Sequence, residues 1–289
     1  MERSVCLKHV PQRRTPLRAT PNPYVAARSA KDEPSTRRGC LFVIEATENS
    51  LSVLEIIHEN EGAGITGIAE ETGLAKSTVH DHIETLEELG YVVQSDHGFR
   101  LSYRFVQFGF SLRNRVRYST EVEQKVTQLA RRTDERAHYV VEERGKSVFL
   151  FTDTGENAIK TNVSPGDFVP LYATASGKAI LAHLPEPRIE TIITEIDLDP
   201  VTERTITDKE ELRIELQQIR SGGVAYNDGE YIDNLWSVGA PVFDTEDSLL
   251  GSMSVSVPAN RLRHDGVTDE LTAKLLETVN ELELDIAYA

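Results

Sequence analysis

The chain has only two cysteines, one tryptophan and two methionines among 289 residues, and no apolar run approaches the thickness of a bilayer. Cys6 and Cys40 both fall in the N-terminal segment, outside every periodic element, which excludes a disulfide framework and a cysteine-based zinc site. A membrane span needs about 20 apolar residues, and the start has no apolar signal core. We therefore expect a soluble, cytoplasmic protein, long enough for two domains that are held by ordinary packing.

Residues 65–90 read ITGIAEETGLAKSTVHDHIETLEELG and have the spacing of a helix-turn-helix. The apolar period stops at Gly73 and resumes at Leu74, which predicts two short helices with one apolar seam. We expect Thr66 to cap the first helix and Gly73 to end it with a positive φ. The early turns of the second helix, which enter a DNA major groove in this motif, present Lys76, Ser77, Thr78, His80 and Asp81.

A strand-like Tyr91–Val93, a turn over residues 95–98 and a second strand at residues 99–101 predict a β-hairpin wing. The segment is thus a predicted winged helix that reads duplex DNA. The alternative, a helix-turn-helix that only packs proteins together, stays open. Arg100 in the wing and Arg104 just after it complete the predicted set of DNA contacts.

Amphipathic helices are predicted on both sides of this motif. The earlier one follows Ile44, with Asn49 or Ser50 as a cap. The later one, over residues 103–118, mixes aromatic residues with arginines. Because its aromatic side chains need burial, we interpret it as a linker helix that contacts another subunit or the wing rather than DNA.

The charge of the DNA-binding part is unusual. Residues 41–118 hold 6 Lys+Arg against 12 Asp+Glu, whereas DNA-binding domains are usually basic. The whole chain has a net charge of −16 and far more arginine than lysine, a pattern typical of proteins from salt-loving archaea. In concentrated salt the Debye length falls to roughly 3 Å, so an acidic domain can still bind DNA through close contacts.

The predicted fold class is α+β, with a domain on each side of the linker helix. Residues 1–40 are rich in proline and arginine and predict a disordered basic leader, either an arm on DNA phosphates, a solvated tail or translation upstream of the true start. Residues 41–102 form the winged helix-turn-helix domain. Residues 119–289 form a mixed domain, with strands predicted around 138–142, 147–152, 237–243 and 251–257, and helices from 119 and around 173–184, 186–195, 208–220 and 265–287.

Six blocks in order resemble the IclR family of transcriptional regulators, over residues 46–287. They are ATENSLSVLE, TGLAKSTVHDHIETLEELGYV, the wing with FRLSYRFVQFG, PLYATASGKAILAHLP, GGVAYNDGEY, and APVFD followed by GSMSVSVP. The resemblance implies a GAF-like effector domain, a homodimer or tetramer, and a small organic or aromatic acid that alters affinity for a double-stranded operator. The effector-binding positions that it implies are Thr174, Ala175, Ser176, Gly177, Asn227, Asp228, Ser237, Ser254 and Ser256.

Physical chemistry agrees with these positions. A helix that opens near Ser176 offers free backbone N–H groups to a carboxylate, and serines two apart on a strand share a side. The chain departs from the family at Asn227, where an acid is usual, and at Ser237, where cysteine is frequent. It also has Asp81 where arginine is common, although a carboxylate can accept from cytosine N4.

Other functions find less support in the sequence. The run Ser176–Lys178 lacks the upstream glycines of a P-loop, and no Gly-x-Ser-x-Gly motif occurs. His80 and His82 are two apart on a helix and point away from each other, which makes a poor metal pair. We therefore expect no enzyme, no cofactor and no metal. The alternative function is a DNA-binding regulator, architectural or dimerising, that has lost effector binding.

Overall fold

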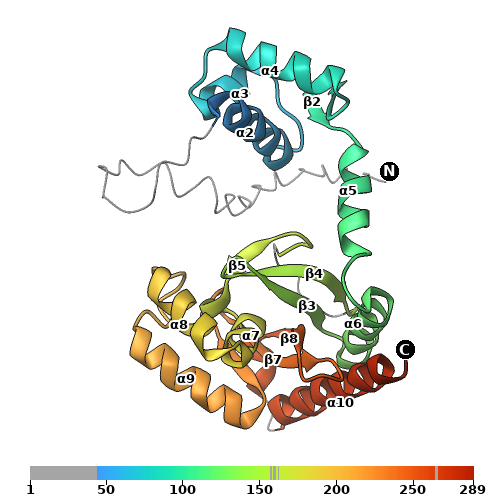
Figure 1. Cartoon of the computed structure of the whole chain (residues 1–289), viewed down its shortest axis with the longest axis vertical. Coiled ribbons are helices and arrows are strands. Elements are labelled where there is room, and N and C mark those ends of the chain that lie inside the picture. Colours follow the sequence, from blue (N-terminus) through green and yellow to red (C-terminus); the bar gives the residue numbers. More distant parts are fainter. Residues whose placement is uncertain (1–43, 157, 159–160, 162, 264–265) are drawn as a thin grey trace, which may run out of the picture.

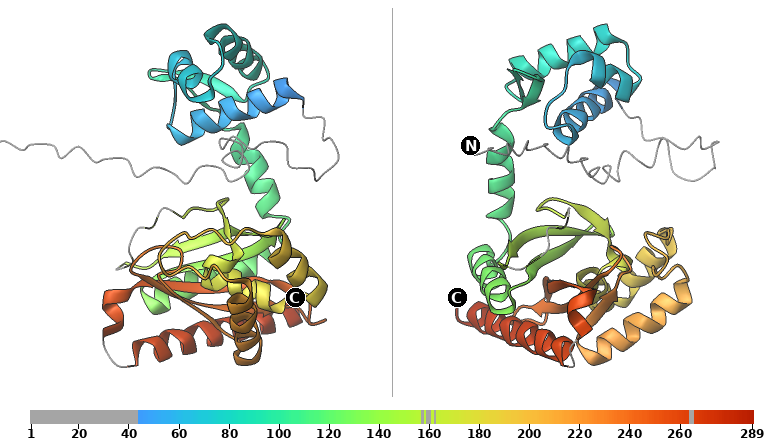
Figure 2. Two further views of the ribbon diagram at one scale, coloured as in Figure 1. Left: turned by 90° about the vertical axis from the view of Figure 1, so that its left-hand side faces the viewer. Right: turned by 180° about the vertical axis from the view of Figure 1, so that it is seen from behind.

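The computed structural model describes residues 44–156, 158, 161, 163–263 and 266–289. They form two domains joined by one helix, α5 (Arg104–Arg113), which stands between the domains in each view (Figure 1; Figure 2). The leader predicted for residues 1–40 lies outside the described residues. No helix in the described part of the chain is long and apolar enough to cross a membrane.

Three helices build the N-terminal domain: α2 (Glu45–Glu59), α3 (Ile65–Thr72) and α4 (Lys76–Glu88). Their buried faces share one core, in which Val53, Ile68 and Ile83 are each at most 2% exposed. Gly73 ends α3 with a φ of 72°, a left-handed conformation that glycine adopts without steric penalty. The predicted helix-turn-helix is confirmed.

The predicted caps of the first two helices are wrong. α3 begins after Gly64, and Thr66 lies inside its first turn without a side-chain capping bond. α2 already begins at Glu45, so neither Asn49 nor Ser50 stands at its N-terminus. Residue preference for a cap is a weak signal, and packing of the helices on the domain core overrides it.

The wing consists of β1 (Val92–Ser95) and β2 (Gly98–Leu101), which pair antiparallel. Gly98 has a φ of 112°, and a Cβ there would lie 2.5 Å from the carbonyl oxygen of Ala63. This close approach lets Ala63 and Phe99 exchange backbone hydrogen bonds of 2.8 and 2.9 Å. The wing is therefore fixed to the segment that precedes α3.

The linker helix is shorter than the predicted 103–118. α5 ends at Arg113, and Tyr118 takes a left-handed φ of 58° before α6 (Ser119–Thr133) begins. A residue with a positive φ cannot continue a right-handed helix, so the chain turns at this point.

One six-stranded antiparallel sheet forms the centre of the C-terminal domain, with the order β5-β4-β3-β8-β7-β6. The four central strands match the sequence predictions with wider bounds, whereas the two edge strands are additional. The strands are β3 (Arg136–Glu143), β4 (Lys146–Thr154), β5 (Phe168–Pro170), β6 (Ala225–Asp228), β7 (Leu235–Phe243) and β8 (Leu249–Pro258).

Helices cover both faces of this sheet (Figure 1; Figure 2). α6 and α10 (Val267–Tyr288) pack on one face, around Leu129, Val255 and Leu275, which have no exposed surface. The other face carries a second core. Its helical elements are η1 (Leu171–Ala173), α7 (Ala175–His183), α8 (Glu186–Glu195) and α9 (Lys209–Gly222), and η2 (Ala259–Arg263) follows β8. The α+β class is confirmed.

Candidate DNA-reading helix and effector pocket

α4 carries the predicted DNA-reading residues on its outer side. Val79, Ile83 and Leu86 are buried in the domain core and fix the orientation of the helix. The opposite side exposes Lys76, Ser77, His80 and Asp81, with Thr78 half-buried beside them. α4 also lies at the end of the molecule away from the C-terminal domain (Figure 1). Its early turns are therefore accessible to a DNA groove.

The two predicted arginine contacts are engaged within the domain. Arg104 donates to the carbonyl of Leu89 at 2.7 Å, and its guanidinium lies 4.6 Å from the ring centre of Tyr91. Leu89 closes α4, where unpaired carbonyl groups favour a cation. Arg104 therefore caps the C-terminal end of α4, and its side chain remains exposed. Arg100 donates to a neighbouring backbone carbonyl at 3.1 Å and stays partly exposed.

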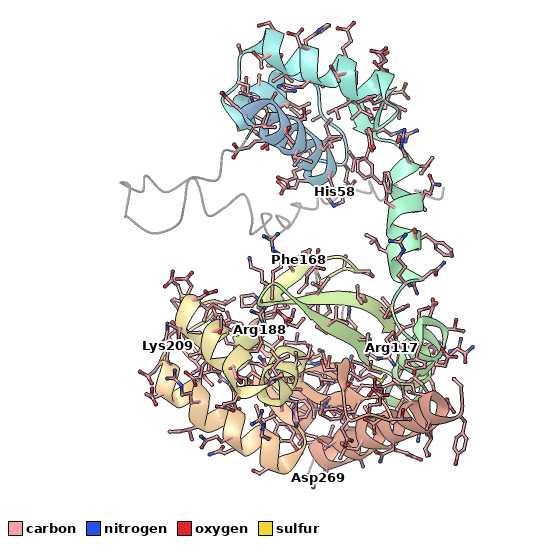
Figure 3. The ribbon with its side chains drawn as sticks, viewed as in Figure 1. His58, Arg117, Phe168, Arg188, Lys209 and Asp269 are labelled. Carbon is pink, nitrogen blue, oxygen red and sulfur yellow. The ribbon has the colours of Figure 1, made fainter. Side chains whose placement is uncertain are left out.

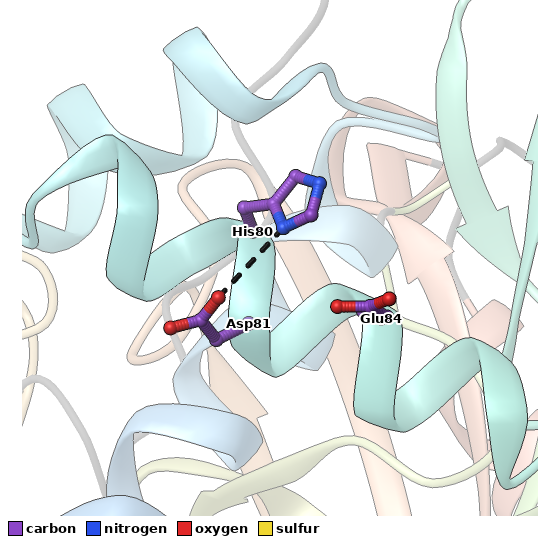
Figure 4. Close-up of side chains that lie close together, drawn as sticks. All are labelled: His80, Asp81 and Glu84. Atoms are coloured by element: carbon purple, nitrogen blue, oxygen red, sulfur yellow. Dashed lines mark ion pairs between the residues drawn. The ribbon is translucent and has the colours of Figure 1, made fainter.

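His80, Asp81 and Glu84 lie together on the exposed side of α4 (Figure 4). Nδ1 of His80 is 3.8 Å from the carboxylate of Asp81, and the possible ligand atoms of all three lie within 4.8 Å. All three side chains are exposed, and such groups are common on helix surfaces without an ion. The cluster therefore supports no metal assignment. His82 instead bonds Ser50 of α2, with Nδ1 and Oγ 2.9 Å apart.

A pocket lies between the start of α7, the sheet and the loop that joins β6 to β7. It encloses a space of about 30 Å³, or about 360 Å³ when the open space at its mouth is counted. Seven of the nine predicted effector residues line it: Thr174, Ala175, Ser176, Asn227, Ser237, Ser254 and Ser256. Ser237 and Ser256 are paired across β7 and β8, and Ser254 follows two residues away on the same side.

Gly177 and Asp228 do not line this pocket, contrary to the sequence prediction. Asp228 follows Asn227 on β6, and successive strand residues point to opposite sides. Its exposed carboxylate lies 2.6 Å from Arg204. Gly177 serves packing, because a Cβ there would lie 2.2 Å from the carbonyl oxygen of Leu171.

The N-terminus of α7 contributes backbone donors to the pocket. Oγ1 of Thr174 accepts from the N–H of Gly177 at 3.0 Å and caps the helix. Ala175 and Ser176 hold the first two helical positions, whose N–H groups have no acceptor within a helix. Gly239 of β7 permits close approach, since a Cβ there would lie 2.8 Å from the carbonyl oxygen of Ala175. These donors and the helix dipole suit an anion.

Buried polar contacts hold the loop between β6 and β7 beside the pocket. Asn227 donates to the carbonyl of Ala173 at 2.6 Å and accepts from the N–H of Glu230 at 3.2 Å. The Glu230 carboxylate lies 2.7 Å from Nζ of Lys178, a residue of α7 that is 1% exposed. Glu215 of α9 lies 3.1 Å from the same ammonium. Burial raises the pKa of Glu230, and the charge of Lys178 opposes that rise.

Sequence reasoning missed five lining residues, which are His138, Phe149, Tyr231, Ile232 and Leu235. His138 on β3 is 4% exposed, and its Nδ1 lies 3.0 Å from Oγ1 of Thr152. Its ring meets Phe149 edge-on, with centroids 5.0 Å apart. Burial, helped by the charge of Arg136, lowers the pKa of His138 to about 3, so the imidazole is neutral near pH 7.

The buried neutral imidazole predicts a pH-dependent stability. The unfolded chain binds a proton at His138 below a pKa of about 6.5, whereas the folded protein binds it only near pH 3. Between these values the unfolded state holds more protons, so the free energy of unfolding falls as pH falls, by up to about 1.4 kcal/mol per pH unit. Denaturant unfolding of the wild type and His138→Phe measures this slope. Equal slopes would contradict a neutral His138.

The strands that carry the pocket serines also contact the linker. Asp244, in the turn between β7 and β8, lies 2.8 Å from Arg117. Arg117 follows α5 at the edge of the C-terminal domain (Figure 3). Arg113 at the end of α5 lies 4.4 Å from the ring centre of Phe151 on β4. The sheet that lines the pocket and the helix that leads to the DNA-binding domain are thus directly joined.

Comparison with known proteins identifies the family of both domains. Residues 46–96 match the IclR helix-turn-helix domain, and residues 114–284 match the C-terminal domain of bacterial IclR transcriptional regulators. A Halobacterium salinarum protein described as a probable HTH-type transcriptional regulator, ArcR, is 30% identical over 256 residues. That match covers 85% of this chain and 95% of the relative.

Solved structures have the same fold. IclR of Thermotoga maritima matches with a TM-score of 0.72 and 27% identity, covering 84% of this chain and 98% of that one. An IclR homolog of Microbacterium hydrocarbonoxydans, solved with 4-hydroxybenzoate, matches with a TM-score of 0.70 and 22% identity, covering 83% and 98%. The chain therefore belongs to the IclR family of transcriptional regulators, with a DNA-binding helix-turn-helix domain followed by an effector domain.

Proposed function

We propose that this chain binds an operator through α4, and that a small acid in the pocket of the effector domain changes its affinity for that operator. The observation that carries the proposal is the presence, in one chain, of a helix with an outward polar side and a pocket at the N-terminus of another helix. The helix supplies the contact with DNA, and the pocket supplies the signal.

The outer side of α4 suits a mixed contact with DNA. The ammonium of Lys76 can neutralise a phosphate, while the hydroxyls of Ser77 and Thr78 can meet phosphates or base edges. Asp81 can accept from cytosine N4 but repels phosphates, so the operator of this protein differs from those of relatives with arginine there.

We expect Lys76→Ala and Thr78→Ala each to weaken operator binding about tenfold, because each removes one contact of about 1 to 3 kcal/mol. The operator sequence comes from selection of a random duplex library by the purified wild-type protein, and fluorescence anisotropy then gives each affinity. Lys209→Ala removes the same charge from the far end of the effector domain and should keep full affinity. Unchanged affinity in both α4 variants would make the recognition-helix assignment wrong.

The lining of the pocket supports an acid with an apolar body. The N–H groups of Ala175 and Ser176 suit a carboxylate, whereas Phe149, Ile232 and Leu235 suit a carbon skeleton. The Microbacterium homolog was solved with 4-hydroxybenzoate, which is an acid of this kind. We accordingly propose a small organic or aromatic acid as the effector of this chain.

The contact between Arg117 and Asp244 suggests how a ligand could change DNA binding. A ligand that binds β7 and β8 more tightly in one arrangement favours that arrangement over others. Because the turn between these strands contacts Arg117, in the segment between α5 and α6, such a shift would move the linker and the DNA-binding domain with it. The coupling free energy between the pocket and the DNA-binding domain equals the difference in the free energy of ligand binding between the two arrangements.

We propose that the apolar side of α5 binds a second copy of the chain. No residue of α5 is buried in the monomer. Val106 and Phe110 are 63% exposed, Leu112 is 65% exposed, and Tyr103 just before the helix is 79% exposed. Apolar groups gathered on one helix commonly mark a protein interface. A homodimer, alone or as half of a tetramer, would place two recognition helices on one operator.

Phe110→Asp is expected to shift this assembly toward the monomer and to weaken operator binding, because it places a charge in the centre of the proposed interface. Sedimentation equilibrium of the wild type and the variant measures the change. Ile214→Asp, at a 57% exposed site on α9, is the matched control and should leave the mass unchanged. A monomeric wild type, or a variant with the mass of the wild type, would contradict the proposed interface.

We also propose that this regulator acts in the cytoplasm, on the chromosome, and in concentrated salt. Its net charge of −16 and the relative in Halobacterium salinarum support the salt environment. At molar salt, repulsion between the acidic domain and DNA is screened beyond a few ångströms. Binding assays therefore belong at molar potassium chloride.

A further inference from the structure

We infer that His138 contacts the effector through Nε2, and that the pocket thereby selects acids with a hydroxyl or keto oxygen in addition to the carboxylate. The inference rests on the proposed effector role of the pocket. It adds to that role a residue which neither the sequence motifs nor the family resemblance points to.

The position of His138 leaves one ring nitrogen for a ligand. On β3 it stands between Thr152 of β4 and Ser254 of β8, which are its register partners. Nδ1 is occupied by the hydroxyl of Thr152 at 3.0 Å. Nε2 lies across the ring from Nδ1, and among the described residues only Nδ1 of this imidazole has a hydrogen-bond partner. Because His138 lines the pocket, Nε2 is the atom that a bound molecule can reach.

The surroundings of His138 favour an uncharged partner for this nitrogen. The ring is almost fully buried, and the guanidinium of Arg136 lies on the same side of β3, two residues away. Arg136 donates to the carbonyls of Thr161 and Val163, and it forms no ion pair with a described carboxylate. A second positive charge beside it, away from water, is unfavourable. The imidazole therefore acts as a hydrogen-bonding group rather than as a counter-ion.

The pocket consequently has two kinds of polar subsite. The first turn of α7 suits a carboxylate through the N–H groups of Ala175 and Ser176 and the helix dipole. The neutral ring of His138 suits an oxygen without charge, since either tautomer can pair with a hydroxyl. An acid without such an oxygen would leave Nε2 unpaired in a closed site, which lowers its affinity.

The test compares acids that differ by one hydroxyl. The probes are lactate with propionate, 3-hydroxybutyrate with butyrate, and 4-hydroxyphenylacetate with phenylacetate, titrated into the full chain by calorimetry at molar salt. For the wild type we expect at least one hydroxylated acid to bind about tenfold more tightly than its partner. His138→Phe keeps a ring but no polar atom and should bind both members of that pair equally.

Two amide variants of His138 test the same contact without relying on His138→Phe. Glutamine can place a polar atom near Nε2, whereas asparagine can place one only near Nδ1. His138→Gln should keep the preference for the hydroxylated acid, and His138→Asn should lose it. Circular dichroism melting shows that each titrated variant is folded.

Two results would overturn the inference. One is a hydroxyl preference that survives in His138→Phe or His138→Asn, which would assign it to other groups such as the serines. The other is a wild type that binds none of the six acids or does not discriminate within any pair. If DNA binding still depends on Lys76 in that case, the chain is a DNA-binding regulator whose effector belongs to another class. Loss of DNA binding as well would remove the proposed function itself.

Discussion

Lys178→Met is expected to lower the free energy of unfolding by about 3 to 5 kcal/mol, because it leaves the buried carboxylate of Glu230 without its cationic partner. The ammonium of Lys178 is 1% exposed and lies within 3.1 Å of Glu215 and 2.7 Å of Glu230. Methionine fills much the same volume, so the loss measures charge rather than a cavity. Chemical denaturation at constant pH and salt concentration gives the difference from the wild type.

Two further variants isolate this effect. Lys274→Met removes a lysine whose partner, Glu270, lies 2.6 Å away on the surface of α10, and it should change stability little. Lys178→Met combined with Glu230→Gln removes the buried charge on both sides and should recover part of the loss. A single variant as stable as the wild type would show that the ion pairs do not hold the loop beside the pocket.

Gly177→Ala is expected to destabilise the effector domain by about 3 kcal/mol or more, through overpacking at a site without free space. The added Cβ would lie 2.2 Å from the carbonyl oxygen of Leu171 and 2.7 Å from Oγ of Ser147. The closer neighbour is backbone, so relief requires α7 to move away from η1. Thermal and chemical unfolding measure the loss of stability.

The same substitution elsewhere serves as the control. Gly67 lies inside α3, and apart from its chain neighbours and the backbone of its own helix no atom lies within 4 Å of its Cβ position. Gly67→Ala should therefore stabilise the protein by about 0.5 to 1 kcal/mol. Gly177 lies two residues after the start of α7, beside the pocket, so Gly177→Ala should also lose effector binding. Wild-type stability and binding in Gly177→Ala would show that α7 and η1 are not packed as described.

The winged helix was predictable because its signals are local. The helical spacing around Gly73 and the turn before Gly98 each depend on a few consecutive residues, and the structure confirms both elements. The start of a helix is harder to predict. Thr66, Asn49 and Ser50 are good caps by residue type, but tertiary packing favours a start at Glu45 for α2 and at Ile65 for α3.

Long-range arrangement limited the prediction of the pocket. The motifs placed Ser237, Ser254 and Ser256 correctly on strands, but His138 joins them only through the pairing of β3 with β8. That register is set by chain segments more than a hundred residues apart. The edge strands β5 and β6 are too short to give a clear alternation.

Other site residues look ordinary in the sequence. Lys178 reads as a surface charge on a helix, and only the folded chain brings Glu215 and Glu230 to it. The capping role of Arg104 is hidden as well, because its partner Leu89 is near only once the wing has folded back. Strand alternation could have separated Asn227 from Asp228, had β6 been recognised.

Crosslinking and sequencing of the DNA bound by the tagged protein in its own cells tests the central claim most directly. Native salt keeps the acidic domain under its proposed working conditions, and a strain with Lys76→Ala is the matched control. The account predicts a small set of sharp peaks over palindromic sites, reduced or absent in the Lys76→Ala strain. A wild-type profile without peaks, or one that the Lys76→Ala strain reproduces, would contradict operator recognition by α4.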